Sequence, residues 1–222
     1  MTAPSFVLRY FDLIGLAETS RMLLTAAKVE WTEEHPEWPQ EKPNQPFGHL
    51  PVLVEKSGAK DTPDFVLSES GSIERYLART FNFIPADLKQ AARQEQLRDQ
   101  HLDIIIAFFS QMQMVGEAQK ERKDEFDEML NKLAEIHTTT LRENGDCGRL
   151  FGNALSFGDM SAYAFYKLFV MYAVTFDAAV GPIVKDKITP EVMSLIRAVE
   201  SDPLLEEHVA KKGSLLSHIL PE

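Results

Sequence analysis

The sequence has 222 residues, of which 44% are hydrophobic and 26% charged, and its formal net charge is -11. This length suits one large domain or two small ones. The acidic balance argues against nucleic-acid binding and against docking to anionic lipid, because both need clustered positive charge. A single cysteine cannot form an internal disulfide, no histidine pair has a metal-binding spacing, and the longest apolar runs are too short to span a bilayer. We therefore expect a cytoplasmic protein that binds no metal.

The first eighty residues mix strand and helix signals. Residues 5–11 are typical of a strand, residues 16–28 predict a helix, and residues 29–35 alternate weakly, like an edge strand. A loop rich in proline follows, and then two short apolar runs with the signature of a hairpin, at 50–56 and 64–70. Residues 70–81 predict a second helix. The order is that of a compact α/β unit.

Strand signals stop near residue 86. Residues 86–112 have the length and composition of a long helix, and residues 156–174 are apolar nearly all round, which predicts a central buried helix. Another helix face is formed by residues spaced three and four apart: Phe126, Met129, Leu130, Leu133 and His137. Two short helices are predicted at 189–203 and 203–213. We expect an α/β domain at 1–82, a linker at 83–87 and an all-α domain at 88–222.

Three short stretches have both a structural and a chemical interpretation. Tyr10 ends the first strand, where it can pack against the core or direct its hydroxyl into a cleft. Pro51 opens a strand; the preceding bond belongs either to an ordinary turn or to a cis peptide that presents the Leu50 backbone to a peptide-like ligand. Ser70 can cap a helix, and it can also complete a carboxylate pocket at the helix start, with Glu69 accepting a bond from an ammonium group.

A further pair of residues is interpreted as a folding device. Ser156 and Asp159 form a capping box at the start of the apolar helix, with Leu155 available as a hydrophobic staple. We expect Asp159 to be buried and bonded to backbone N–H groups.

Taken together, these motifs resemble a cytosolic glutathione transferase. The stretches "LRYFDLIGLAETSR", "EWPQEKPNQPFGHLPVLV" and "LSESGSIERYLA" are most similar to the sigma class, and the resemblance extends over essentially the whole chain. It implies a thioredoxin-like α/β domain that binds glutathione, followed by an all-helical domain with the electrophile site. It also implies a homodimer active in detoxification that uses glutathione as co-substrate and no other cofactor.

The resemblance also assigns roles to single residues. Tyr10 matches the tyrosine whose O–H stabilises the glutathione thiolate, the nucleophile of the reaction. The remaining matches lie along glutathione: Trp38 and Lys42 at the glycine end, Leu50 and Pro51 at the cysteinyl part, and Glu69 and Ser70 at the γ-glutamyl end. Asp99 resembles an acid that reaches across the dimer. The apolar pocket for the electrophile is assigned to Leu16, Ile105, Phe109, Met112 and Tyr163.

Three positions depart from the sigma pattern. Leu16 stands where an arginine is usual, so a cation that helps to lower the thiol pKa is missing and more of the work is left to Tyr10. His49 stands where a lysine or glutamine is common, and it is still assigned to the glutathione site, where it can hydrogen-bond a carboxylate. Glu69 replaces the usual glutamine. Cys147 is interpreted as a bystander, because classes with a catalytic cysteine have it at the position of Tyr10 or just beyond.

The sequence therefore predicts a transferase that adds glutathione to small hydrophobic electrophiles. Two alternatives stay open at this point. One is a glutathione-dependent isomerase on the same scaffold. The other is a structural or ligand-binding protein of low activity, similar to the lens crystallins of sigma type.

Overall fold

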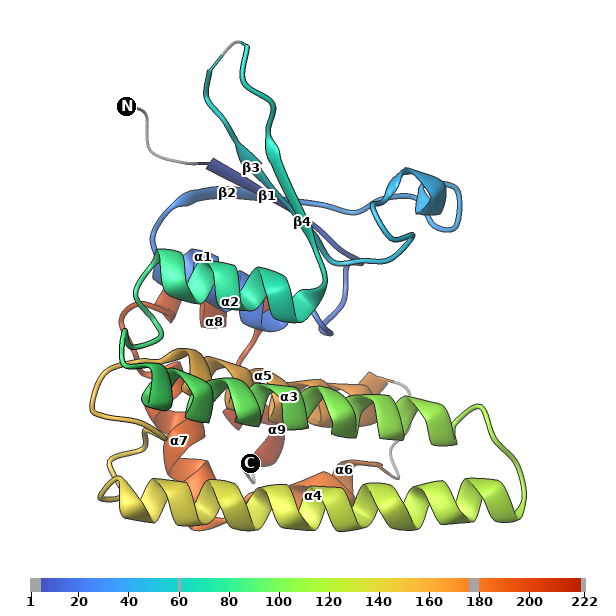
Figure 1. Ribbon diagram of the computed structural model, residues 1–222. Coiled ribbons are helices and arrows are strands. Elements are labelled where there is room, and N and C mark those ends of the chain that lie inside the picture. The colour runs from blue at the N-terminus through green and yellow to red at the C-terminus, as the bar shows by residue number, and fades with distance from the viewer. Residues whose placement is uncertain (1–4, 60, 176–179, 221–222) are drawn as a thin grey trace. The chain divides into compact units, whose positions relative to one another are not determined.

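The computed structural model describes residues 5–59, 61–175 and 180–220 (Figure 1). The chain forms two compact units. The first comprises Met1–Phe83 together with Pro203–Gly213, and the second comprises Ile84–Asp202 together with Ser214–Glu222. The first is built on a sheet and the second on helices, which is the predicted combination of fold classes.

The sheet of the first unit has four strands in the order β2-β1-β3-β4. Strand β1 pairs in parallel with β2 and antiparallel with β3, and β3 pairs antiparallel with β4. The edge position of β2 and the β3–β4 hairpin are both as predicted. The bounds are β1 Ser5–Arg9, β2 Glu30–Glu34, β3 Val52–Lys56 and β4 Phe65–Ser68.

The two faces of this sheet are buried in different ways. Helices α1 (Glu18–Ala26) and α2 (Ser70–Thr80) lie together on one face (Figure 1). Because side chains alternate along a strand, Val7, Val52 and Val54 form a buried cluster against which Leu50 packs.

The proline-rich loop contains one short 3-10 helix, η1 (Lys42–Asn44). The end of β1, this loop and the start of α2 carry the predicted glutathione residues of the first unit.

Helix α8 (Glu206–Lys212) belongs to the first unit, although the sequence places it within the predicted range 88–222. The reason is a buried polar contact with α1. His208 is 3% exposed, and its Nε2 lies 3.0 Å from Oε1 of Glu18, which is 0% exposed. A helix near the end of the chain is thus part of the α/β unit.

The second unit is helical, and the long helices α3 and α4 lie side by side in it (Figure 1). Helix α5 is buried over nearly its whole length, as its apolar sequence predicts. The short helices α6 and α9 were not predicted. The bounds are α3 Leu88–Gln111, α4 Glu117–Glu143, α5 Phe157–Thr175, α6 Val180–Lys185, α7 Pro190–Glu200 and α9 Leu216–Ile219.

The start of α5 has the bonds expected of a capping box. The backbone N–H and the hydroxyl of Ser156 donate to Asp159 Oδ2 at 3.0 and 2.9 Å, and the N–H of Asp159 lies 3.3 Å from Ser156 Oγ. The N–H of Leu150 donates to the other carboxylate oxygen at 2.8 Å. Burial raises the pKa of Asp159 to about 6, although these bonds act in the opposite direction.

A buried polar chain links α3, α4 and α5. The side chain of His101 contacts Ser161 Oγ at 2.8 Å and His137 Nε2 at 3.1 Å, and His137 contacts the Tyr166 hydroxyl at 3.0 Å. We call these four residues the histidine chain. Burial lowers the pKa of His137 to about 3 and that of His101 well below its usual value. Both imidazoles are therefore neutral at pH 7.

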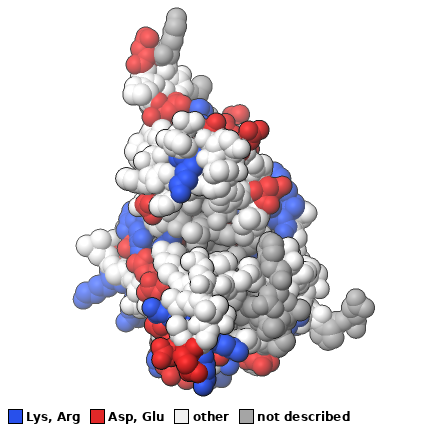
Figure 2. Space-filling view, turned by 90° about the vertical axis from the view of Figure 1, so that its right-hand side faces the viewer, with Lys and Arg blue, Asp and Glu red and all other residues white. Residues whose placement is uncertain are grey.

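The described surface carries charges of both signs. On the face in Figure 2, the Lys and Arg side chains are scattered among Asp and Glu instead of gathering into one basic patch. In the described parts of the chain, no helix is both long and apolar enough to cross a membrane.

Candidate functional site

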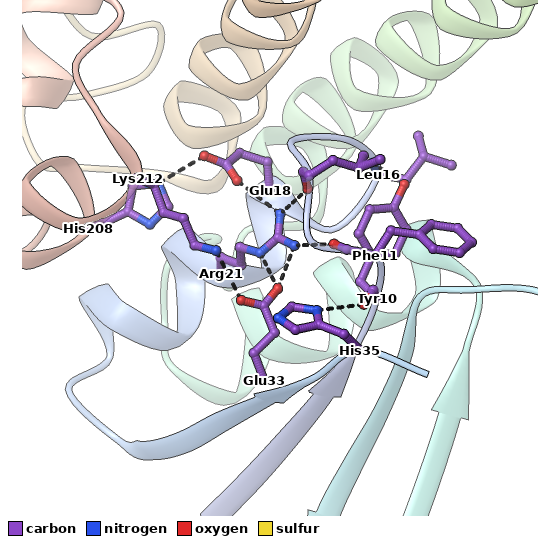
Figure 3. A network of polar contacts seen from close by, with 10 residues as sticks. Tyr10, Phe11, Leu16, Glu18, Arg21, Glu33, His35, His208 and Lys212 are labelled. Carbon is purple, nitrogen blue, oxygen red and sulfur yellow. Dashed lines mark hydrogen bonds and ion pairs between the residues drawn. The ribbon is translucent and has the colours of Figure 1, made fainter. Parts of the chain in front are cut away.

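Tyr10 follows β1 directly and its side chain is 6% exposed. Its hydroxyl oxygen accepts a hydrogen bond from the backbone N–H of Leu16 at 3.0 Å (Figure 3). Among the described residues, none accepts a bond from the Tyr10 hydroxyl hydrogen. A hydroxyl that already accepts one bond still has its proton to donate. The arrangement can stabilise a negatively charged atom placed beside the oxygen.

The environment of Tyr10 keeps that proton in place. Burial raises the pKa of the Tyr10 hydroxyl, while the Leu16 N–H and the positive charge of Arg21 act to lower it. Because the net direction is upward, the group is a neutral O–H at pH 7. It can act as a hydrogen-bond donor and not as a phenolate base.

An aromatic row connects Tyr10 to the proline-rich loop. The ring centroids of Tyr10 and Phe11 lie 5.4 Å apart, and those of Phe11 and Trp38 lie 5.5 Å apart, both edge to face. Lys42 is exposed, and its Nζ lies 6.0 Å from the centroid of the Trp38 ring. The structure therefore brings together Tyr10, Trp38 and Lys42, with an ammonium group available for a carboxylate.

The peptide bond between Leu50 and Pro51 is cis, as is the bond between Trp38 and Pro39. Of the two interpretations of Pro51, the structure has the cis one. No hydrogen bond joins the Leu50 backbone to another described residue, so its N–H and C=O stay available. His49, next to them, is exposed.

Glu69 and Ser70 lie at the junction of β4 and α2. Glu69 has φ +71°, in the left-handed region that non-glycine residues seldom adopt. Its carbonyl accepts the N–H groups of Ser72 and Ile73, while its side chain is exposed and forms no cap. Ser70 is the buried first residue of α2. A strained residue at a helix start is typical of a position held for binding.

The other predicted pocket residues fall in different settings. Leu16 is half-buried in the first unit, where its backbone contacts Tyr10. On α3 of the second unit Ile105 is half-buried and Asp99 is exposed, and Phe109 and, just beyond the helix, Met112 are 39% and 46% exposed. Tyr163 has no exposed surface and donates its hydroxyl to Glu200 at 2.8 Å, so in this structure it lies in the core.

Cys147 is exposed in the turn after α4. The side-chain amide of Asn144 lies 3.3 Å from its sulfur. No group of three or more His, Cys, Asp or Glu side chains within the described residues could hold a metal ion.

A charged cluster beneath Tyr10 was missed by the sequence analysis (Figure 3). Arg21 of α1 is fully buried, and the carbon of its guanidinium lies 5.5 Å from the centroid of the Tyr10 ring. The available signal was a charged residue directly before the apolar run of α1, three positions after an acid. We call the following five residues the Arg21 cluster: Glu18, Arg21, Glu33, His208 and Lys212.

Comparison with known proteins places the chain in a family. A family model described as "Glutathione S-transferase, N-terminal domain" matches residues 6–79. The chain is 28% identical over 210 residues to "Glutathione S-transferase 3" of Caenorhabditis elegans, covering 91% of this chain and 87% of that protein. It is 30% identical over 163 residues to "Probable glutathione S-transferase 6" of the same species, covering 70% and 75%. The chain belongs to the glutathione S-transferase family.

A solved structure agrees with this assignment. A glutathione S-transferase of Caenorhabditis elegans is 27% identical with a TM-score of 0.72, covering 94% of this chain and 98% of that one. The predictions of the family, of its fold class and of a transferase enzyme are thereby confirmed. The sigma class stays a prediction.

Two further relatives bear on the alternative functions. "Hematopoietic prostaglandin D synthase" of Gallus gallus is 28% identical over 160 residues, covering 70% of this chain and 75% of that protein. "S-crystallin 2" of Enteroctopus dofleini is 27% identical over 175 residues, covering 72% and 79%. Names within the family thus include a synthase and a crystallin as well as transferases.

Proposed function

We propose that this glutathione transferase conjugates glutathione to small hydrophobic electrophiles and that Tyr10 stabilises the reacting thiolate. The observation that carries the proposal is the hydroxyl of Tyr10, which accepts the Leu16 N–H at 3.0 Å and keeps its own proton free to donate. A donor aimed at sulfur favours the thiolate over the thiol and so lowers the thiol pKa. The thiol proton leaves to solvent.

The glutathione site is proposed to extend from Tyr10 in two directions. The ammonium of Lys42, beside Trp38, pairs with the glycine carboxylate, with His49 nearby. The start of α2 holds the γ-glutamyl end through Glu69 and Ser70. The Leu50 backbone pairs with the cysteinyl part.

The remaining parts of the proposal concern the helical unit and the assembly. Exposed apolar side chains of α3 are assigned to the electrophile. Asp99 is assigned to the glutamyl amine of a second copy, so the active form is a homodimer. Glutathione is the co-substrate, no other cofactor takes part, and the enzyme acts in the cytoplasm.

The test is conjugation of a chlorinated dinitrobenzene, in which the C–S bond forms, the C–Cl bond breaks and chloride leaves. We expect Tyr10→Phe to lower kcat/KM by about 10²- to 10³-fold, the usual effect of removing one preorganised donor. The matched control is Tyr76→Phe, which removes the hydroxyl that contacts Glu55 in the same unit and should leave the rate unchanged.

Retention on immobilised glutathione separates the alternatives. A wild-type chain that is retained but turns over no faster than Tyr10→Phe would contradict the catalytic role and favour the crystallin-like alternative. A chain that rearranges a substrate and releases glutathione unchanged would favour the isomerase.

A further inference from the structure

Arg21 has every donor of its guanidinium engaged. Its Nε donates to Glu33 Oε1 at 2.6 Å, and one Nη2 proton faces the same oxygen. The Nη1 group donates to Glu18 Oε2 at 3.1 Å and to the Leu13 carbonyl at 3.0 Å, and Nη2 also donates to the Phe11 carbonyl at 3.2 Å. A guanidinium has five N–H donors, and these contacts use all five. The group is therefore fixed in place.

The two carbonyls that Arg21 holds belong to the loop that shapes the Tyr10 site. Phe11 and Leu13 lie between Tyr10 and Leu16, and the N–H of Leu16 is the group bonded to the Tyr10 hydroxyl. Figure 3 shows the guanidinium pointing at this loop from the side of α1. Arg21 thus holds the turn that delivers the Leu16 N–H.

Arg21 also places a positive charge near Tyr10, whereas the side chain of Leu16 carries none. It is 0% exposed, so solvent screens its charge poorly. Its guanidinium carbon lies 5.5 Å from the centroid of the Tyr10 ring. A cation there favours negative charge at or near the hydroxyl.

Helix α8 contacts both carboxylates that bind Arg21, those of Glu18 and Glu33. His208 contacts Glu18 at 3.0 Å, and Lys212 Nζ donates to Glu33 Oε2 at 3.1 Å. The Lys212 side chain is 19% exposed, so it closes the outer side of the cluster. Arg21 pairs with both Glu18 and Glu33, and Lys212 pairs with Glu33, so each buried carboxylate of the cluster has a cationic partner.

We propose that Arg21 is a positioning residue for Tyr10, that it takes over the role of the cation missing at position 16, and that α8 completes its site through His208 and Lys212. This inference rests on the proposed function of Tyr10. It assigns to the C-terminal part of the chain, about 190 residues away, an influence on thiolate formation.

The test is a pH titration of glutathione bound to the protein, followed by thiolate absorbance in the ultraviolet. Arg21→Gln removes the charge and should raise the midpoint of thiol ionisation by about one pH unit. Arg21→Lys keeps the charge and should restore most of that shift. A purely structural role of Arg21 would not separate the two variants in this way.

Lys212→Gln tests the contribution of α8 and stays informative if the Arg21 variants do not fold. Loss of the ammonium leaves Glu33 partly uncompensated beside Arg21, and the midpoint should rise by about 0.5 pH unit. The matched control is Lys211→Gln on the same helix, which removes an exposed ammonium that lies 5.9 Å from the Trp31 ring centroid and should not shift the midpoint. Circular dichroism verifies that each variant is folded.

Tyr10→Phe, measured in the same titration, separates the two levels of the proposal. If it raises the midpoint while Arg21→Gln and Lys212→Gln match wild type, the role of Arg21 is overturned and that of Tyr10 stands. If Tyr10→Phe also matches wild type, the proposed function of Tyr10 fails and the inference fails with it.

Discussion

Each unit of this protein buries a polar cluster, and the two clusters are made differently. The Arg21 cluster of the α/β unit contains full charges, with Arg21 and Glu18 both at 0% exposure. The histidine chain of the helical unit contains neutral groups only, because burial holds the pKa values of both imidazoles low. One cluster adjoins Tyr10, and the other joins three helices.

The difference indicates what each cluster is for. Burying ions costs several kcal/mol each, and a hydrophobic replacement is often as stable, so stability alone is a weak reason to keep a buried ion pair. Neutral hydrogen-bonded groups are less costly to bury and suffice to fix helix packing. The charges of the Arg21 cluster lie close enough to Tyr10 for their electric field to act on it. The histidine chain needs no charge to fix the packing of its helices. Substitutions in the Arg21 cluster should change both the stability of the protein and the ionisation of the bound thiol. Substitutions in the histidine chain should change stability alone.

The largest effect on stability is expected from Arg21→Met. It leaves two buried carboxylates without their common partner, and we expect the free energy of unfolding to fall by about 3–5 kcal/mol. Chemical denaturation measures it. The double variant Glu18→Gln/Arg21→Met leaves one unpaired charge fewer, so its free energy of unfolding should fall less than that of Arg21→Met. A larger loss in the double variant would contradict the account of the cluster as a set of mutually dependent charges.

The histidine chain should make the stability of the protein depend on pH. The pKa of His137 is about 3 in the folded state and about 6.5 when unfolded, so the unfolded chain binds more protons and stability is lost as pH falls from 6.5 towards 3. From His137 alone this amounts to about 2 kcal/mol between pH 7.5 and pH 5. His101 acts in the same direction, while Asp159, with its raised pKa, acts in the opposite one.

A difference measurement isolates His137 from these other groups. The stability gap between wild type and His137→Asn should narrow by about 2 kcal/mol when the pH changes from 7.5 to 5. If the difference in stability between wild type and His137→Asn does not depend on pH, the histidine chain is protonated or open to solvent in solution. The midpoint of thiol ionisation of bound glutathione should be the same in His137→Asn as in wild type.

The smallest effect is expected from an exposed ion pair in the α/β unit. Arg9 Nε lies 2.7 Å from Glu34 Oε2, with side chains that are 33% and 52% exposed. Solvent screens such pairs, so Arg9→Gln should cost less than about 1 kcal/mol in thermal or chemical unfolding. A loss as large as that of Arg21→Met would mean that burial does not distinguish the two sets of charges.

Much of the fold follows from local patterns in the sequence. The hairpin and the long amphipathic helices have enough residues to display a period, while α6 and α9, with six and four residues, do not. The capping box at the start of α5 was visible because its two residues lie three positions apart. The attachment of α8 to α1 was not visible, because it depends on a contact between Glu18 and His208, which are 190 positions apart.

The candidate site was predictable in its side chains and not in its backbone. Tyr10, Trp38 and Lys42 were found from their order along the chain, and the structure brings them together. Leu16 was considered for its side chain, as a missing cation and as part of the electrophile pocket, whereas its backbone N–H is the group that contacts Tyr10. Arg21 fell within the predicted helix at 16–28 without a role of its own, because a sequence pattern does not show which buried groups surround a charge.

The most direct test of the central claim is a structure of the protein with glutathione bound. The account predicts that the Tyr10 hydroxyl oxygen lies about 3–3.5 Å from the glutathione sulfur while it still accepts the Leu16 N–H. A sulfur more than about 4 Å from that oxygen, or one bonded to a different donor, would contradict the role of Tyr10 in stabilising the thiolate.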